Sequence, residues 1–302
     1  MRILFLGTPD FAVESLKILV ENHYEIVGVV TAPDKPSGRG LEIQETPVKK
    51  YAKEKGLKIF QPEKLKSPDF IQSLKELNID LGIVVAFRML PEMVWNLPKM
   101  GTFNLHASLL PNYRGSAPIN WAIIHGEKET GATTFFLKHE IDTGDILLQR
   151  KVSIGEEETA GELYDRLMHL GADLVLETMK LIEKGNYTTM PQAQNNAIHI
   201  APKLYKETAC IPFTKTGFEI HNFIRGMNPF PGAWFMWNDK KIIVYTCRFT
   251  PEAHSMPPGE IHTDYKTYFK VSCSDGFIEI LSLKMEGKKQ MKVVDFLNGI
   301  KR

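Results

Sequence analysis

The chain contains only three cysteines in 302 residues, and their arrangement excludes two common kinds of cross-link. Cys210, Cys247 and Cys273 are odd in number, widely spaced and never part of a Cys-x-x-Cys pair. Disulfide frameworks need paired cysteines, and structural zinc sites need closely spaced ligands. We therefore expect three free thiols and no metal ion.

Long apolar runs are also missing from the sequence. No stretch approaches the roughly 18–20 apolar residues that a membrane-spanning helix requires. Met1 and Arg2 lead directly into a short buried-strand pattern at residues 3–7, and nothing there resembles a signal peptide. We therefore expect a cytoplasmic protein with no membrane contact.

Two further kinds of motif are missing: the glycine-rich motifs that bind nucleotides, and the second triplet that an aspartic protease needs. The first turn reads Gly7-Thr8-Pro9-Asp10 rather than Gly-x-Gly-x-x-Gly, and Pro9 has no backbone donor for a pyrophosphate. No P-loop occurs elsewhere, so NAD and ATP are excluded. The triplet Asp142-Thr143-Gly144 has no second copy, whereas an aspartic protease needs two carboxylates that share a proton.

Strand and helix patterns alternate along the first part of the chain. Short apolar strand patterns occur at residues 3–7, 25–31, 58–60, 81–86 and 101–106, and helix-like stretches at 11–21, 48–55, 69–77 and 91–97. Such alternation is typical of a mostly parallel sheet covered on both faces. With a later helical stretch at 163–183, it predicts an α/β, Rossmann-like domain over residues 1–186.

The remainder of the chain has a different character. Residues 187–202 lack periodicity and contain two prolines, which is typical of a linker. Residues 203–302 contain short alternating runs, which predict a small antiparallel barrel. This segment carries 15 Lys and Arg against 10 Asp and Glu, whereas the rest of the chain is net negative. Positive surface favours a polyanionic partner, although scattered solvated lysines would give the same count.

Asn104, His106 and Asp142 are the candidate catalytic residues. Residues two apart on a strand point to the same face, so Asn104 and His106 can address one substrate. The strand pattern ends before Pro111, where a loop should open. An amide donor, an imidazole and a carboxylate are the groups that transfer of a carbonyl group to an amine requires. Each residue alone also has an ordinary structural explanation.

The surrounding motifs resemble those of the methionyl-tRNA formyltransferase family. The similarity is carried by Phe5–Ala12, Asn104-x-His106, Ser108-Leu109-Leu110-Pro111, Tyr113-Arg114-Gly115-x-Ala117-Pro118-Ile119-Asn120-Trp121, Ile141-Asp142-Thr143-Gly144-Asp145 and Asp295–Gly299. It therefore covers essentially the whole chain. The three catalytic candidates alone would identify only the wider class of enzymes that use 10-formyltetrahydrofolate.

The resemblance implies a function and a set of partners. It implies formyl transfer from the co-substrate 10-formyltetrahydrofolate to initiator methionyl-tRNA, and an OB-like C-terminal domain that binds tRNA. The folate is expected near two segments, and its expected contacts are Phe87, Arg88, Leu90, Ser108, Leu109, Leu110 and Pro111. A flat pterin suits such apolar walls. A monomer is the default expectation.

The loop that follows residues 25–31 is implied to contact the tRNA acceptor end. Arg39 matches the family's basic residue in Gly-Arg-Gly, and a guanidinium offers a planar fork for phosphate. Lys35 and Lys49 are the other expected contacts. Two features depart from the family pattern, namely Leu41-Glu42 after Arg39 and Ile211-Pro212-Phe213, where relatives have Ile-Asp-Trp.

The roles within the site and the function class each leave alternatives. Asn104 is assigned to the oxyanion, and His106 either donates to it or shuttles the proton. Asp142 either holds His106 in the useful tautomer or receives the amine proton through water. An amino-sugar formyltransferase would use the same three residues, and an RNA-binding protein with an inactive α/β domain would not need all three of them.

Overall fold

The computed structural model describes residues 1–37, 42–193 and 198–300. It divides into two compact units. Unit 1 comprises Met1–Arg114, Gly131–Val152 and Tyr164–Ile200, and unit 2 comprises Gly115–Thr130, Ser153–Leu163 and Ala201–Arg302. Each unit has its own sheet and its own buried apolar residues.

Unit 1 is built on a seven-stranded sheet in the order β10-β9-β7-β6-β1-β2-β5. Its strands are β1 (Arg2–Gly7), β2 (Glu25–Val30), β5 (Ile59–Phe60), β6 (Leu81–Val85), β7 (Thr102–His106), β9 (Glu129–Phe136) and β10 (Ile146–Ser153). The five strands from β7 to β5 are parallel, and β9 pairs antiparallel with β7. The predicted α/β class with a largely parallel sheet is confirmed.

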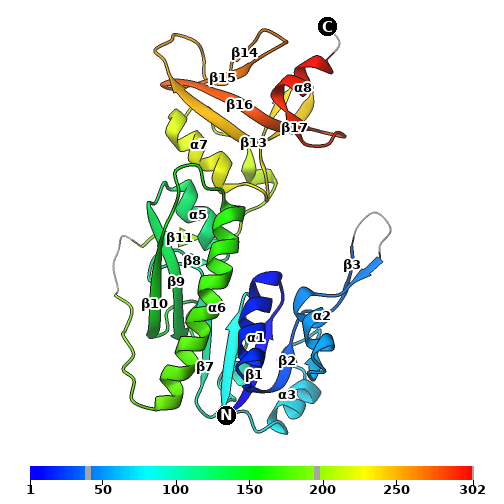
Figure 1. The fold of residues 1–302 in the computed structure, drawn as a ribbon, viewed down its shortest axis with the longest axis vertical. Helices are drawn as coiled ribbons and strands as arrows, with labels where there is room; N and C mark the ends of the chain where they lie inside the picture. The colour runs from blue at the N-terminus through cyan, green and yellow to red at the C-terminus, as the bar shows by residue number, and fades with distance from the viewer. Residues whose placement is uncertain (38–41, 194–197, 301–302) are drawn as a thin grey trace. The chain divides into compact units, whose positions relative to one another are not determined.

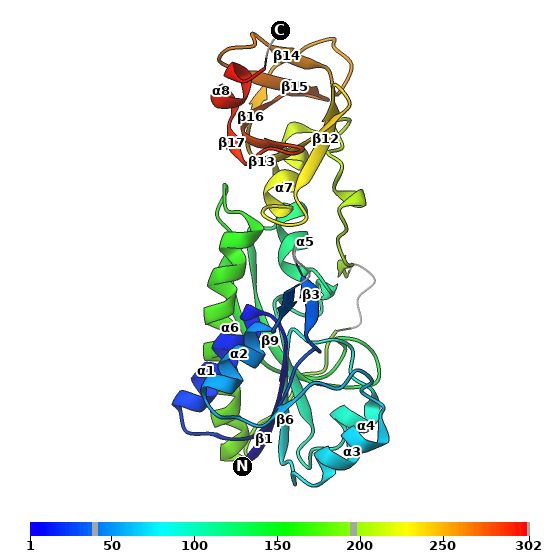
Figure 2. The same ribbon diagram turned by 90° about the vertical axis from the view of Figure 1, so that its right-hand side faces the viewer.

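Helices cover both faces of this sheet, as predicted. They are α1 (Asp10–Glu21), α2 (Pro47–Glu54), α3 (Pro68–Lys75), α4 (Glu92–Trp95) and most of α6 (Ala160–Lys184). Figure 1 and Figure 2 together place α1, α2 and α6 on one face and α3 and α4 on the other. Leu4, Leu6 and Val84 pack with Phe70 and Val94 on the α3 and α4 face. A short hairpin of β3 (Lys35–Ser37) and β4 (Glu42–Gln44) follows β2.

Unit 2 contains a curled antiparallel sheet in the order β12-β13-β16-β15-β14, with β17 paired to β16. The strands are β12 (Ala233–Trp237), β13 (Lys240–Pro251), β14 (Ile261–Thr263), β15 (Phe269–Cys273), β16 (Gly276–Met285) and β17 (Met291–Lys292). Its helices are α5 (Pro118–Ile124), the 3-10 turn η1 (Glu207–Ala209), α7 (Gly217–Gly226) and α8 (Val293–Asn298). The predicted C-terminal β-domain of OB-like type is confirmed. The small pair β8 (Arg114–Gly115) and β11 (Ile200–Ala201) completes the elements.

Buried apolar residues of α7 and α8 pack against the sheet of unit 2. Ile220 and Ile224 of α7 and Phe296 of α8 belong to one cluster with Phe235 and Phe269 of the sheet. Gly217 begins α7 where a Cβ would lie 1.9 Å from the Phe249 ring, so only glycine allows this approach. The cysteines are free thiols, as expected, and burial raises the pKa of Cys247 and Cys273.

Candidate active site

Asn104 and His106 lie on β7, and the pleat turns both side chains toward the α3 and α4 face. Asn104 pairs with Val84 of β6, which packs on that face. Leu105 points the opposite way, toward α6. Its side chain lies so near Gly171 of α6 that a Cβ on this glycine would be only 2.8 Å from it. His106 is the last residue of β7, so it lies at the carboxyl edge of the parallel strands, where α/β folds bind ligands.

His106 is buried, and a main-chain acceptor orients its ring. Its side chain is 7% exposed, and Nε2 lies 2.8 Å from the carbonyl oxygen of Tyr113. A carbonyl oxygen can only accept, so Nε2 carries the proton and the neutral ring keeps its lone pair at Nδ1. Nδ1 lies 3.9 Å from Oδ2 of Asp142, a carboxylate that is 12% exposed. Nδ1 is thus the atom of the imidazole that can exchange a proton beside a carboxylate.

Asp142 reaches His106 from an unexpected direction. Because β9 runs antiparallel to β7, the loop between β9 and β10 starts beside Thr102, where Leu137 donates its backbone N–H to the Thr102 carbonyl. His106 lies at the other end of β7, about 13 Å away at 3.3 Å per residue. The loop must therefore fold back over the sheet, and Asp142 takes a left-handed φ of 54° to do so.

The Asn104 side chain lies on the same face of β7 as His106. Among the residues described, its side chain makes no hydrogen bond, although it is half-buried. An amide that leaves its donors unused beside a buried histidine can turn them to a developing negative charge. The structure thus brings Asn104, His106 and Asp142 to one region of the sheet.

The loop after β7 is held by hydrogen bonds that involve its main chain. Ser108 is fully buried, and its hydroxyl donates to the carbonyl of Asn112 at 2.7 Å. Thr133 donates to the Ser108 carbonyl, and Gln149 donates to the Leu110 carbonyl at 2.8 Å. Leu110 is buried as well, whereas Leu109 and Pro111 are partly exposed. The side chains of Ser108 and Leu110 therefore shape the loop from inside.

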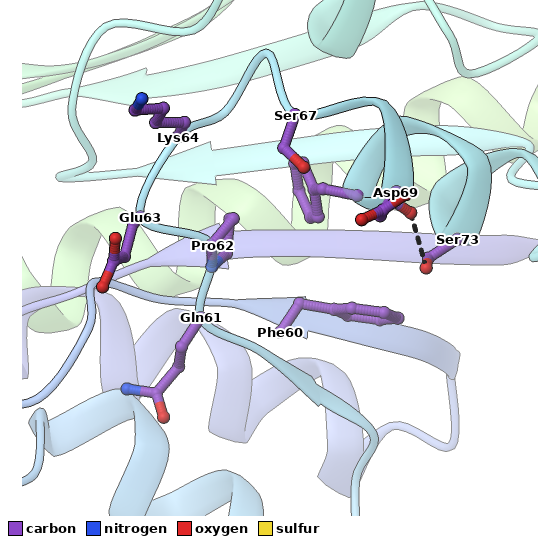
Figure 3. A pocket seen from close by; sticks show the side chains of 9 residues that line it. Phe60, Gln61, Pro62, Glu63, Lys64, Ser67, Asp69 and Ser73 are labelled. Atoms are coloured by element: carbon purple, nitrogen blue, oxygen red, sulfur yellow. Dashed lines mark hydrogen bonds between the residues drawn. The ribbon is translucent and has the colours of Figure 1, made fainter.

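The other segment expected to contact folate lies after β6. Leu90 is buried, and Phe87 packs on the same apolar cluster. Arg88 is exposed, and its guanidinium donates to the carbonyls of Glu63, at 3.0 Å, and Pro62. Pro62 and Glu63 line a hollow of about 510 Å³ between the end of β5 and α3 (Figure 3). Asn104, His106 and Asp142 are not among its lining residues.

The residues expected to contact tRNA differ in how available their charges are. Arg39 lies outside the described residues. Lys35 is exposed on β3. Lys49 is only 15% exposed, and its ammonium contacts the carboxylates of Asp34 and Glu45. The hydrogen bond to Asp34 raises the pKa of Lys49, and Lys49 together with Gln61 lowers the pKa of Asp34. Lys49 therefore ties the base of the hairpin to α2.

Two negative observations concern the described part of the chain. Within residues 1–37, 42–193 and 198–300, histidine, cysteine and acidic side chains nowhere gather in threes that could hold a metal ion. No helix in the same ranges combines the length and the apolar character needed to cross a bilayer.

One residue that the sequence did not single out is Gln192, which lies in the segment predicted as a linker. It contacts the loop between β9 and β10, residues 137–145, which we call the Asp142 loop. No pattern in that segment distinguishes this glutamine.

Comparisons with known proteins agree over the whole chain. The family described as formyl transferase matches residues 1–179, and the formyl transferase C-terminal domain matches residues 203–301. Methionyl-tRNA formyltransferase of Bacteroides fragilis is 49% identical over 99% of this chain and 95% of its own length. The enzyme of the same name from Flavobacterium johnsoniae is 51% identical over 99% and 96%, respectively.

Solved structures share the fold at lower identity. A sugar 3N-formyl transferase, WlaRD, solved in the presence of dTDP and 5-N-formyl-THF, superposes with a TM-score of 0.70 and 23% identity, covering 96% of this chain and 99% of its own. HypX from Aquifex aeolicus in complex with tetrahydrofolic acid has a TM-score of 0.66 and 21% identity, covering 100% and 48%. At such identity these likenesses concern the fold alone. The two family matches and the near-half identity over full length show that the chain belongs to the methionyl-tRNA formyltransferase family.

Proposed function

We propose that this protein transfers the formyl group of 10-formyltetrahydrofolate to the α-amino group of initiator methionyl-tRNA, yielding N-formylmethionyl-tRNA for translation initiation in the cytoplasm. The observation that carries the proposal is the near-half identity to methionyl-tRNA formyltransferases across both family regions. The convergence of Asn104, His106 and Asp142 supplies groups suited to the reaction.

The acceptor amine needs little activation. An α-amino group has a pKa of about 7.7–8.0, so a substantial fraction is neutral and nucleophilic near neutral pH. Attack on the formyl carbon makes the carbonyl oxygen negative and the attacking nitrogen positive. The site must therefore stabilise an oxyanion and remove a proton, without a covalent nucleophile.

Asn104 and His106 divide these two tasks in our proposal. The Asn104 amide donates to the oxyanion, because its donors are unused by the described residues. His106 accepts the amine proton at Nδ1, since Nε2–H is engaged by the Tyr113 carbonyl. Asp142 stabilises the resulting imidazolium from 3.9 Å. The tetrahedral intermediate then collapses: the formyl C=O re-forms, the bond between the formyl carbon and the folate N10 breaks, and the imidazolium of His106 gives its Nδ1 proton to N10.

The folate contacts remain proposals drawn from the resemblance. The buried side chains of Ser108 and Leu110 leave the main chain of the loop, with Leu109 and Pro111, as the surface that faces a ligand. Phe87 and Leu90 would supply apolar contacts to the folate. Arg88 would contribute indirectly, by hydrogen bonds that hold the main-chain carbonyls of Glu63 and Pro62. No metal ion is required by any of these steps.

For the acceptor tRNA we propose Arg39 and Lys35 as phosphate contacts, and assign Lys49 a supporting role. Its ammonium is already shared between two carboxylates, so a phosphate would have to displace them. Arg39→Ala should raise the KM for aminoacyl-tRNA while leaving folate binding unchanged. A parallel loss of folate binding would show that Arg39 supports the fold instead.

The direct test supplies both substrates together. The purified protein is incubated with 10-formyltetrahydrofolate and charged initiator tRNA, and the amino acid is released and identified. Formylmethionine supports the proposal. Its absence, with formylation of a nucleotide-linked amino sugar in a parallel reaction, would favour the sugar-modifying alternative.

A further inference from the structure

Gln192 connects three parts of unit 1 through one side-chain amide. Its Nε2 donates to the carbonyl oxygens of Asp142 and Gly144, each at 2.8 Å. Its Oε1 accepts from Arg114, at 3.1 Å from Nε and 2.6 Å from Nη2. The amide therefore uses both of its donors and both of its acceptor lone pairs.

The chemistry of the partners leaves only one orientation for this amide. Arg114 can only donate and the two carbonyls can only accept, so oxygen faces the guanidinium and nitrogen faces the loop. A carboxylate in place of the amide would repel both carbonyls, and an asparagine would be one methylene too short to reach all four atoms. Among natural side chains, glutamine alone meets these four requirements.

The Asp142 loop needs such an anchor. It starts beside Thr102 and folds back toward His106, with Asp142 in the left-handed region. Gly144 sits so close to the sheet that a Cβ would lie 1.5 Å from the carbonyl oxygen of Phe136. A left-handed conformation in a residue other than glycine costs about 1 kcal/mol or more, and the surrounding contacts must maintain it.

The segment that carries Gln192 is itself anchored next to this loop. Met190 forms an isolated antiparallel bridge with Ile146, with backbone hydrogen bonds of 2.8 and 2.9 Å. Ile146 is the first residue of β10, directly after the loop. The bridge therefore delivers Gln192 two residues later at a fixed distance from Asp142 and Gly144.

We propose that Gln192, oriented by Arg114, is a positioning residue that holds the main chain of the Asp142 loop, and thereby sets the distance between the Asp142 carboxylate and His106. This inference deepens the proposed formyl transfer and rests on it for its kinetic consequence. A misplacement of about 1 Å in a catalytic group can cost 10²-fold in rate. Substrate binding does not depend on this contact.

The test compares three variants of Gln192 with matched variants of another glutamine. Gln192→Glu keeps the shape and the pairing with Arg114 but repels the carbonyls, Gln192→Met removes all four hydrogen bonds, and Gln192→Asn shortens the reach. Gln72→Glu and Gln72→Met, at an exposed position on α3, are the controls. Steady-state formylation, melting temperature and hydrogen exchange of the peptide 138–146 are measured for each.

We expect kcat to fall about 10–100-fold in all three Gln192 variants, with both KM values within about twofold of wild type. Exchange in 138–146 should accelerate, and the Gln72 variants should match wild type. A Gln192→Glu protein with wild-type kcat, or with reduced kcat and unchanged exchange, would overturn the inference. If Gln192→Glu fails to fold, the Met and Asn variants decide.

The exchange measurement separates this inference from the proposed function. If wild-type protein forms no formylmethionine, the proposed substrate pair is wrong, yet accelerated exchange in 138–146 of Gln192→Met would still show that Gln192 anchors the loop. Unchanged exchange in an active enzyme would refute the anchor and leave the proposed function standing.

Discussion

At the scale of single residues, the site is decided by which atoms can donate and which can accept. The Tyr113 carbonyl keeps the proton on Nε2 of His106, so a role for Asp142 in choosing the tautomer is unnecessary. Of the two roles considered from sequence, shuttling the proton suits His106 better than donating to the oxyanion. Nδ1 lies 3.9 Å from Oδ2 of Asp142, on the side of the ring away from the Tyr113 carbonyl.

Removing the oxyanion donor tests the role of Asn104. Asn104→Ala should lower kcat by about 10²–10³, the usual cost of losing one oxyanion-hole donor. Single-turnover formylation with saturating substrates measures the chemical step. An activity within twofold of wild type would place Asn104 outside the chemistry.

Removing the imidazole tests the proton transfer. His106→Ala should lower kcat by about 10²–10⁴. His169→Ala is the control, because His169 is exposed on α6 and should have no effect. Equal activities of the two variants would contradict the assignment of His106 as the proton acceptor.

At the scale of elements, the sequence predicted the secondary structure of unit 1 well and its long-range connections poorly. The pattern at 48–55 corresponds to α2, which begins at Pro47 after the N-cap Thr46. Arg114, for example, bonds to the amide of Gln192, which lies 78 residues further along the chain. A period-two or period-3.6 pattern reports burial of one face, and it carries no signal for such contacts.

The start of α7 offers a stability test at this scale. Thr216 and Glu219 form a capping box, and Lys215 donates to the same carboxylate at 2.8 Å. Thr216→Ala should lower the free energy of unfolding by about 1 kcal/mol. Thermal or urea unfolding near neutral pH measures the change.

The same cap predicts a pH dependence. Hydrogen bonds from Lys215 and Thr216 lower the pKa of Glu219 to about 2 from its ordinary 4.5. Because the folded-state pKa is depressed, the stabilisation is complete above pH 4.5 and is lost as the pH falls toward 2. Glu219→Gln should therefore destabilise at pH 7, and the difference from wild type should shrink through this window. A constant difference down to pH 2 would disprove this contribution.

At the scale of the whole molecule, charge is unevenly divided between the parts of the chain. Residues 203–302 carry 15 basic and 10 acidic residues, although the protein as a whole has a net charge of only +1. Positive potential over the C-terminal β-domain would attract the many phosphates of a tRNA far more strongly than a small donor that carries only the carboxylates of its glutamate tail.

Ionic strength should therefore separate the two substrates. Two phosphate contacts already imply about a tenfold loss of affinity between 50 and 200 mM salt. The kcat/KM for aminoacyl-tRNA should fall by at least that factor, whereas the KM for 10-formyltetrahydrofolate should change far less. Equal salt dependence for both substrates would count against a tRNA acceptor.

The sequence by itself determined the fold class, the strand that carries both Asn104 and His106, and the membership of the family. Each of these depends on the local spacing of residues or on a contiguous motif. Only the tertiary structure decided how Asp142 reaches His106, which nitrogen of the imidazole is free, and that Gln192 holds the loop between them. These features depend on an antiparallel strand, a main-chain carbonyl and a residue 50 positions away from Asp142, and packing alone brings them together.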